Sequence, residues 1–342
     1  MTNPLIVWNG TSLGQERNEG YKSAEDNILA QLYDMNIYKT CLSQFAYVEA
    51  DILINNRLPI DYQLSNGYNI GFSYWETTKL PSSWVDSMNQ MDEIWTTSSW
   101  AKNVFEDSGV TVPVFNFKLG VDSELFKPVL KQKPHYPFTF LCIGAPSTRK
   151  NSQMVVDAFI KLFGKDDRYR LIYKSVDAPD ARIINDRGEL TSIYNYPNIV
   201  VIDQDVTLTK LSSIYDLADC LAYPTSGEGW GMLPYQALAK AIPTICTDET
   251  ACIEYAHLSI PLKYKLGTKS MSGIYGDCGN WAEPNFDDLC DKMLYVVNNY
   301  EEVASLTYSN VEKVYHEMTW EYVAKDYKDR LCQILKKLET KH

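Results

Sequence analysis

The chain has 342 residues, of which 45% are hydrophobic and 22% charged, as in a globular protein of two ordinary domains. Its formal net charge of -12 argues against a nucleic acid or an anionic membrane as the main partner. We expect a cytoplasmic protein with reduced cysteines, because the sequence shows no signal peptide, no apolar stretch as long as a membrane span, and no paired metal-ligand spacing among its eight cysteines.

The first third of the chain alternates short apolar runs with helical patterns, which is typical of a parallel sheet covered by helices. We expect strands at residues 5–8, 50–54, 68–72, 93–97 and 112–115. Helices are expected at residues 22–33 and 100–107, the second with Ser99 as its N-cap. The glycine-containing loop at residues 9–21 follows the first strand, so we place it at the carboxyl edge of the sheet, where such folds bind ligands. A plain surface loop is the alternative.

Trp75 and Glu76 come directly after the strand expected at residues 68–72, with Pro81 and Trp84 close behind. Aromatic rings stack on sugar faces, and a carboxylate accepts hydrogen bonds from sugar hydroxyls. We therefore predict a carbohydrate contact at this strand end. The alternative for Glu76 is a structural pair with a neighbouring basic group.

A basic, proline-containing stretch at residues 131–137 is typical of a linker, and the strand, loop and helix pattern then starts again. A continuous apolar run at residues 138–143 indicates a buried parallel strand. The loop at residues 144–151 follows it and carries two cations, Arg149 and Lys150. Further strands are expected at 169–173 and 199–202, and helices at 209–218, at 286–297 and from residue 320 onward. An extended loop is expected at 271–284.

The stretch at residues 221–246 changes from strand to glycine-rich loop, then to helix, then to strand again. Three glycines alternate through the loop and let the backbone approach a bulky ligand: Gly227, Gly229 and Gly231. The helix begins near Pro234, and its first amides and positive dipole end suit an anion. Glu228 lies inside the loop, where it suits sugar hydroxyls. An anion cradle beside a hydroxyl acceptor predicts a nucleotide-sugar site, with an ordinary strand-to-helix turn as the alternative.

This loop resembles the pattern S-x-E-G-F-G-x-x-x-x-E-A of the retaining glycosyltransferases of family 4, which have the GT-B fold. The matching residues are Ser226, Glu228, Gly229, Trp230, Gly231 and Ala237, with Trp230 as the aromatic and Gln236 at the second Glu. The resemblance implies two doubly wound, Rossmann-like α/β domains that face each other across a cleft. It places an acceptor-side domain at residues 1–130, a nucleotide-sugar domain at 131–318, and a final helix at 319–342 that packs back on the first domain. A dimer helix is the alternative for that last segment.

The resemblance also implies roles for individual residues. Glu228, Lys150 and Arg149 form the expected catalytic group, with Ala145 at the position of a family Arg that Arg149 replaces. The expected donor-binding residues are Ser226, Gly229, Trp230, Gly231, Met232, Leu233, Gln236, Lys174 and Gly20. Some relatives carry a tryptophan and glutamate pair like Trp75 and Glu76, which places these two on the acceptor side.

The function that follows is transfer of a sugar from a nucleotide-diphosphate sugar to a hydroxyl acceptor, with retention of configuration. The acceptor is a glycan, a lipid, a protein or a modified base. The resemblance implies no metal ion and no cofactor besides the donor substrate. Two alternatives stay open: a non-catalytic sensor or partner subunit that binds nucleotide sugars, and a phosphorylase or epimerase with the same cradle.

Overall fold

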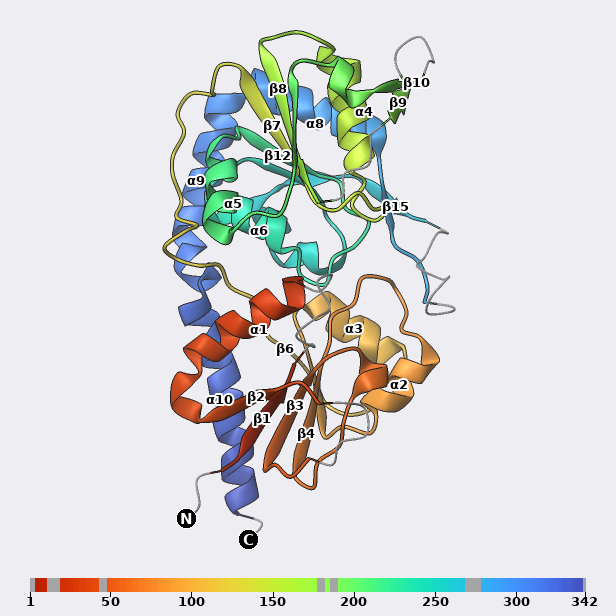
Figure 1. The fold of residues 1–342 in the computed structure, drawn as a ribbon, viewed down its shortest axis with the longest axis vertical. Helices are drawn as coiled ribbons and strands as arrows, with labels where there is room; N and C mark the ends of the chain where they lie inside the picture. The colour runs from red at the N-terminus through yellow and green to blue at the C-terminus, as the bar shows by residue number, and fades with distance from the viewer. Residues whose placement is uncertain are drawn as a thin grey trace. The chain divides into compact units, whose positions relative to one another are not determined.

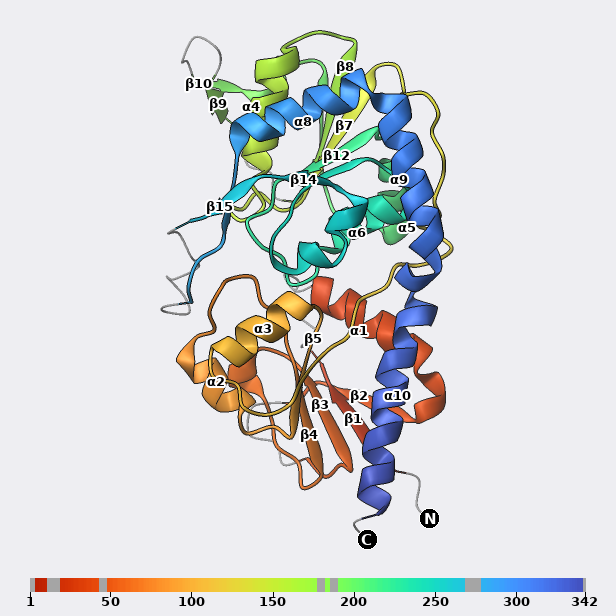
Figure 2. The same cartoon turned by 180° about the vertical axis from the view of Figure 1, so that it is seen from behind.

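The computed structural model describes residues 4–10, 19–42, 48–176, 182–184, 190–267 and 278–340. The chain divides into two compact units, shown in Figures 1 and 2. The first unit contains Met1–Gly120, Lys269–Asn280 and Glu317–His342. The second contains Val121–Thr268 and Trp281–His316. None of the helices in the described ranges combines the length and the apolarity that a membrane crossing requires.

A six-stranded parallel sheet, in the order β2-β1-β3-β4-β5-β6, forms the centre of the first unit. Its strands are β1 (Ile6–Asn9), β2 (Ile37–Thr40), β3 (Ile52–Asn56), β4 (Tyr68–Phe72), β5 (Glu93–Thr96) and β6 (Val114–Asn116). The strands β1, β3, β4 and β5 are buried along their whole length. Their sequences are mainly apolar, as expected for parallel strands covered on both faces, with a few buried polar residues such as Asn55 and Glu93. The sequence did not predict β2, because this edge strand is short and carries exposed polar residues.

Among the described residues, the first unit has the α-helices α1 (Glu19–Gln31), α2 (Ser82–Met88), α3 (Ser99–Asp107) and α10 (Trp320–Glu339). Two short 3-10 helices, η1 (Tyr33–Met35) and η2 (Pro59–Asp61), lie between its strands. The helix α1 begins earlier than the expected residue 22. The N-cap of α3 is Ser98 and not the expected Ser99, because the Ser98 side chain accepts the hydrogen bond from the Ala101 amide at 3.0 Å. The helices α1 and α10 lie side by side in both views.

The helix α10 is held in the first unit by an aromatic cluster and a buried ion pair. The Tyr327 ring packs against Phe117 at 4.8 Å and against Trp95 at 5.8 Å between ring centroids. Arg330 donates to the fully buried Glu93, with Nη2 at 2.5 Å from Oε2. Glu93 also accepts hydrogen bonds from the Tyr68 hydroxyl and the Trp95 indole, so its charge is fully compensated.

The second unit is built on another six-stranded parallel sheet, in the order β11-β8-β7-β12-β13-β14. Its strands are β7 (Phe138–Ile143), β8 (Tyr169–Ser175), β11 (Ile199–Asp203), β12 (Cys220–Tyr223), β13 (Thr244–Thr247) and β14 (Ile260–Leu262). Two antiparallel pairs accompany it: β9 (Arg182–Ile184) with β10 (Leu190–Ser192), and β15 (Tyr264–Leu266) with β16 (Ala282–Pro284). The loop expected at 271–284 lies partly outside the described residues, and its end forms β16.

The α-helices of the second unit are α4 (Ser152–Phe163), α5 (Leu208–Asp216), α6 (Met232–Ala239), α8 (Phe286–Asn298) and α9 (Tyr300–Val314). Its short 3-10 helices are η3 (Ile193–Asn195), η4 (Thr250–Glu254), η5 (Ala256–Leu258) and η6 (Tyr315–Met318), the last shared with the first unit. One core joins α4 and α8 to the sheet through Phe159, Leu289 and Met293. The sequence did not predict α9, whose buried residues are Tyr300, Val303, Ala304, Thr307 and Val311.

The strand order places a topological switch point between β7 and β12. From β7 the chain continues outward to β8 and β11, and from β12 it continues the other way to β13 and β14. The loops after β7 and β12 therefore diverge at the same sheet edge, which is where doubly wound sheets bind ligands.

Candidate functional site

Two loops meet at the switch point of the second unit: residues 144–151 after β7 and residues 224–231 after β12. Ser226 donates its backbone amide to the Arg149 carbonyl at 2.7 Å. The Asn151 side-chain amide donates to the Pro224 carbonyl at 2.8 Å and to the Ser226 hydroxyl at 2.9 Å. These bonds hold the two loops together, so the predicted cations and the predicted carboxylate belong to one site.

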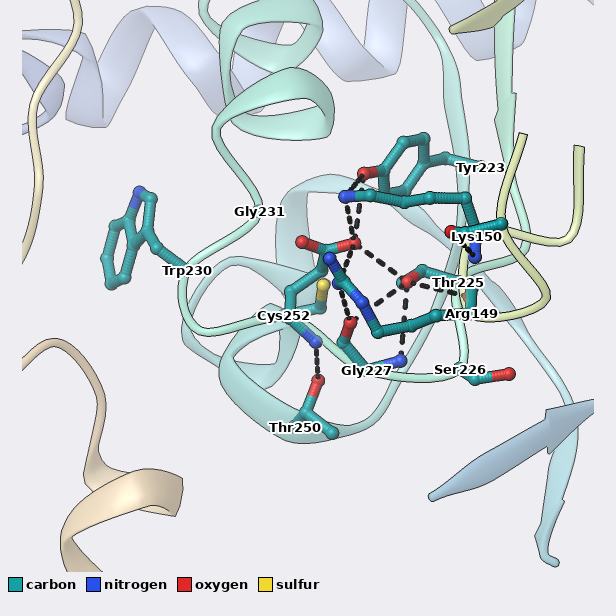
Figure 3. Close-up of polar contacts among 12 residues, drawn as sticks. Arg149, Lys150, Tyr223, Thr225, Ser226, Gly227, Trp230, Gly231, Thr250 and Cys252 are labelled. Atoms are coloured by element: carbon teal, nitrogen blue, oxygen red, sulfur yellow. Dashed lines mark hydrogen bonds and ion pairs between the residues drawn. The ribbon is translucent and has the colours of Figure 1, made fainter. Parts of the chain in front are cut away.

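Glu228 is the centre of this site, with only 5% of its surface exposed. Its Oε1 atom lies 2.6 Å from Lys150 Nζ and 3.2 Å from Arg149 Nη1. The same oxygen accepts hydrogen bonds from the Tyr223 hydroxyl at 2.9 Å and the Thr225 hydroxyl at 2.8 Å (Figure 3). Within the described part of the chain, the hydrogen bonds and ion pairs of this carboxylate all end on Oε1.

These contacts decide the charge of Glu228. Burial opposes ionisation, but the charges of Lys150 and Arg149, with hydrogen bonds from Lys150 and Thr225, outweigh it and lower the pKa of Glu228 to about 2. The carboxyl group is therefore ionised at neutral pH. Two cations surround one anion, which leaves this cluster of three charged side chains with a net charge of +1.

Tyr223 connects the cation to the carboxylate. Lys150 Nζ donates to the Tyr223 hydroxyl at 2.6 Å and lies 5.2 Å from the centre of its ring. Burial, followed by the nearby Glu228 charge, raises the pKa of Tyr223 well above its usual value of 10. Tyr223 is thus a neutral phenol that accepts from Lys150 while it donates to Glu228.

The backbone of the glycine-rich loop is held by the segment after β13. The Glu228 amide donates to the Thr250 hydroxyl at 3.0 Å, and the Ala251 amide donates to the Glu228 carbonyl at 3.3 Å. The Tyr255 hydroxyl lies 2.8 Å from the Trp230 carbonyl. Gly231 has a φ of +81°, and a Cβ atom there would lie 2.3 Å from the Tyr255 hydroxyl, so only glycine fits.

The helix α6 directs its N-terminus at this loop, with Gly231 as N-cap. The amides of Met232 and Leu233 belong to the first helical turn, which has no intrahelical acceptors for them. Together with the positive dipole end, such amides attract anions. Gln236 lies deeper in α6 and is buried, with Oε1 at 3.4 Å from the Tyr215 hydroxyl.

Trp230 is buried, and its ring packs edge-on against Tyr235 and Tyr255, at 5.1 Å and 5.8 Å between centroids. In Figure 3 its indole points away from Lys150 and Arg149. Gly229, the loop residue before Trp230, lies in the same buried loop. The structure thus places the aromatic residue of the motif in the packing that supports the loop.

Lys174 lies at the end of β8, next to β7, and is buried, with Nζ donating to the Ser175 carbonyl at 3.1 Å. Asp203 and Asp205 form an Asp-x-Asp sequence at the end of β11, and both are exposed. Among the described residues, no group of three or more His, Cys, Asp or Glu side chains is arranged to hold a metal ion.

Three of the predicted residues belong to the first unit. Gly20 lies in the first turn of α1. Trp75 is 2% exposed and lies in the core, where it packs against Trp84 and donates its indole N–H to the Lys79 carbonyl at 3.0 Å. Its ring therefore fills the core and presents no free face for a sugar. Glu76, the next residue, is half-buried.

Among the described residues, three that contact Glu228 through a side-chain hydroxyl were not predicted as site residues: Tyr223, Thr225 and Thr250. Tyr223 has the pattern of a buried strand residue, and nothing in the sequence shows that its hydroxyl faces the loop. Thr225 lies three residues before Glu228, a spacing that permits a local side-chain contact.

This chain has two parallel six-stranded sheets covered by helices, and this α/β fold is that of solved GT-B glycosyltransferases. Solved structures with this fold include HepE from Anabaena in complex with UDP and glucose, at 10% identity and a TM-score of 0.65, over 96% of this chain and 100% of that one. Sucrose-phosphate synthase from Thermosynechococcus elongatus matches at 12% identity and a TM-score of 0.61, over 94% and 80%. The pneumococcal O-GlcNAc transferase GtfA, in complex with UDP and GlcNAc, matches at 13% identity and 0.55, over 83% and 57%. The chain matches no protein-family model and no curated protein sequence.

Proposed function

We propose that this chain is a retaining glycosyltransferase, which moves a sugar from a nucleoside-diphosphate sugar to a hydroxyl acceptor without a metal ion. One observation carries the proposal. Lys150, Arg149 and Glu228 meet at the switch point of a GT-B unit, beside the N-terminus of α6. Solved neighbours with this fold hold UDP with glucose, UDP-glucose, or UDP with GlcNAc.

The two cations and the first amides of α6 would hold the diphosphate of the donor. Glu228 already balances one of the two positive charges, so the pair carries one spare charge toward a ligand. A diphosphate that arrives would draw Lys150 and Arg149 toward its oxygens. Preorganised donors of this kind stabilise a leaving group by about 3 kcal/mol each when water is excluded.

Glu228 would hold the hydroxyls of the donor sugar. Its Oε1 atom is bound by two cations and two hydroxyl groups, whereas Oε2 makes no hydrogen bond or ion pair with the described residues. An ionised carboxylate oxygen accepts hydroxyl hydrogen bonds strongly. The low pKa of about 2 keeps Glu228 in that accepting form at neutral pH.

The transfer step would take place on one face of the sugar. The acceptor hydroxyl oxygen forms the new bond to the anomeric carbon while the bond from that carbon to the diphosphate oxygen breaks. The electron pair of the broken bond stays on the diphosphate, which takes the hydroxyl proton. Glu76 is the proposed acceptor-side carboxylate, and the acceptor is a glycan, lipid, protein or modified base.

The test is release of nucleoside diphosphate from UDP-, GDP- and ADP-sugars, with and without a panel of hydroxyl acceptors. We expect release that depends on an acceptor and that falls at least a hundredfold in Lys150→Ala. Lys161→Ala is the control, because Lys161 is an exposed cation in the last turn of α4. Nucleotide binding without any release would favour a non-catalytic sensor, and release that does not depend on an acceptor would contradict sugar transfer.

A further inference from the structure

The segment Thr250–Tyr255, formed by η4 and the residue after it, grips the glycine-rich loop from outside the predicted motif. We infer that Thr250 is a positioning residue that fixes the peptide of Glu228 for transfer, an inference that rests on the proposed function. The Thr250 hydroxyl accepts a hydrogen bond from the main-chain amide of Glu228.

Two consecutive residues hold both polar groups of the Glu228 main chain. Thr250 Oγ1 accepts the Glu228 amide at 3.0 Å, and the Ala251 amide donates to the Glu228 carbonyl at 3.3 Å. The Thr250 hydroxyl in turn donates to the Glu249 carbonyl at 2.7 Å. Its own proton is thereby directed away from Glu228, which leaves an oxygen lone pair for the Glu228 amide.

The backbone conformation of Thr250 is unusual for its residue type. Its φ is +58°, in the left-handed region that β-branched residues avoid because Cβ crowds the backbone. Glycine or asparagine is the usual residue in this conformation. Thr250 is only 1% exposed, so contact with water does not explain why a polar side chain stands at this position. Backbone strain at a buried threonine indicates that its hydroxyl is needed at this position. The group that this hydroxyl binds is the Glu228 amide.

The neighbours of Glu228 show what this contact adds. Gly227 and Gly229 flank it, and glycine permits more backbone conformations than other residues. The Gly227 carbonyl accepts hydrogen bonds from Arg149 and from the Thr225 hydroxyl, and Thr250 holds the Glu228 amide of the same peptide. Four donors fix one carboxylate oxygen, but a turned peptide would carry Oε2 to a new direction. Lys150 and Arg149 come from the loop after β7 and pair with Oε1, the carboxylate oxygen that stays fixed. Loss of the Thr250 hydroxyl should therefore impair transfer more than nucleotide binding.

The experiment compares Thr250→Ser, Thr250→Ala and Thr250→Gly, with Thr307→Ala as the control. Serine keeps the hydroxyl, alanine removes it, and glycine removes both the hydroxyl and the strain. Thr307 is a buried threonine of α9 whose hydroxyl donates to the Val303 carbonyl at 2.9 Å. We expect kcat to fall about tenfold in the alanine and glycine variants, the effect of one buried hydrogen bond, and to stay within about twofold in serine and in the control.

The Kd for UDP separates positioning from general damage, and we expect it to stay within about threefold in all four variants. The inference is overturned if Thr250→Ala keeps the full kcat, if Thr250→Ser loses as much as Thr250→Ala, or if kcat and UDP affinity fall together. If the unsubstituted chain releases no diphosphate, the proposed function fails. A crystal structure of Thr250→Ala then decides the inference alone: a turned Glu228 peptide supports it, and an unchanged one overturns it.

Discussion

Lys150 Nζ lies 2.6 Å from Glu228 Oε1, although the two residues are 78 positions apart and belong to loops after different strands. Both side chains are largely buried, so the attraction between them is weakly screened by water. The contact joins the phosphate-binding and the sugar-binding halves of the proposed site. Changes on either side of this ion pair should therefore be felt on the other.

Acid should destabilise the protein through Glu228. Its pKa is lowered from 4.5 to about 2, so its stabilising contribution is full above pH 4.5 and is lost as the pH falls toward 2. A shift of this size corresponds to about 3 kcal/mol. We expect the unfolding midpoint of the native chain to fall more steeply between pH 4.5 and 2.5 than that of Glu228→Gln. Equal slopes in thermal melts across that range would contradict the assigned ion pair.

The Tyr223 hydroxyl should matter for transfer. Tyr223→Phe removes the group that accepts from Lys150 and donates to Glu228, while the ring stays in place. We expect kcat to fall about tenfold, since a buried partner of two charged groups is lost. Tyr308→Phe on α9, whose hydroxyl donates to Glu312, is the control and should leave kcat unchanged. A Tyr223→Phe variant with native kcat would show that the hydroxyl is not needed.

Gly231 should tolerate no side chain while Tyr255 is present. Gly231→Ala forces a Cβ into the left-handed region and against the Tyr255 hydroxyl, so we expect a loss of about 2 kcal/mol or more in the free energy of unfolding. Tyr255→Phe removes the clashing oxygen. The double variant should lose less stability than the sum of the two single variants in denaturant unfolding. Strict additivity would mean that the two groups do not clash.

Removal of Arg330 should loosen α10 from the first unit. Arg330→Met leaves Glu93 buried without its cation, which costs about 3 kcal/mol. Arg330→Met combined with Glu93→Gln should recover part of this loss. Lys328→Met is the control, since its partner Asp34 is exposed and the pair should not affect stability measurably. Equal melting temperatures of Arg330→Met and Lys328→Met would contradict this account.

The sequence predicted strands best where a run of residues is mainly apolar, as in β7. It failed at β2, a four-residue edge strand whose two central residues are exposed, and at α9, whose buried face includes Tyr300, Ala304 and Thr307. Neither segment has the mainly apolar run that indicated β7. Tertiary contacts alone make them regular.

The candidate site divides in the same way. The motif drew attention to Glu228 and Lys150 but did not show that they form an ion pair, since spacing along the chain says nothing about distance across two loops. Thr250 was invisible because threonine is a poor predictor of a positive φ. Trp75 looked like a sugar-stacking ring, yet a tryptophan at a strand end fills a core equally well, and here it does.

A crystal structure of the chain soaked with UDP tests the central claim most directly. We predict a diphosphate within hydrogen-bond distance of Lys150 Nζ, Arg149 and the first amides of α6, with the Lys150 to Glu228 contact lengthened from its 2.6 Å. A diphosphate bound elsewhere, or none at saturating UDP, GDP and ADP, would contradict the account.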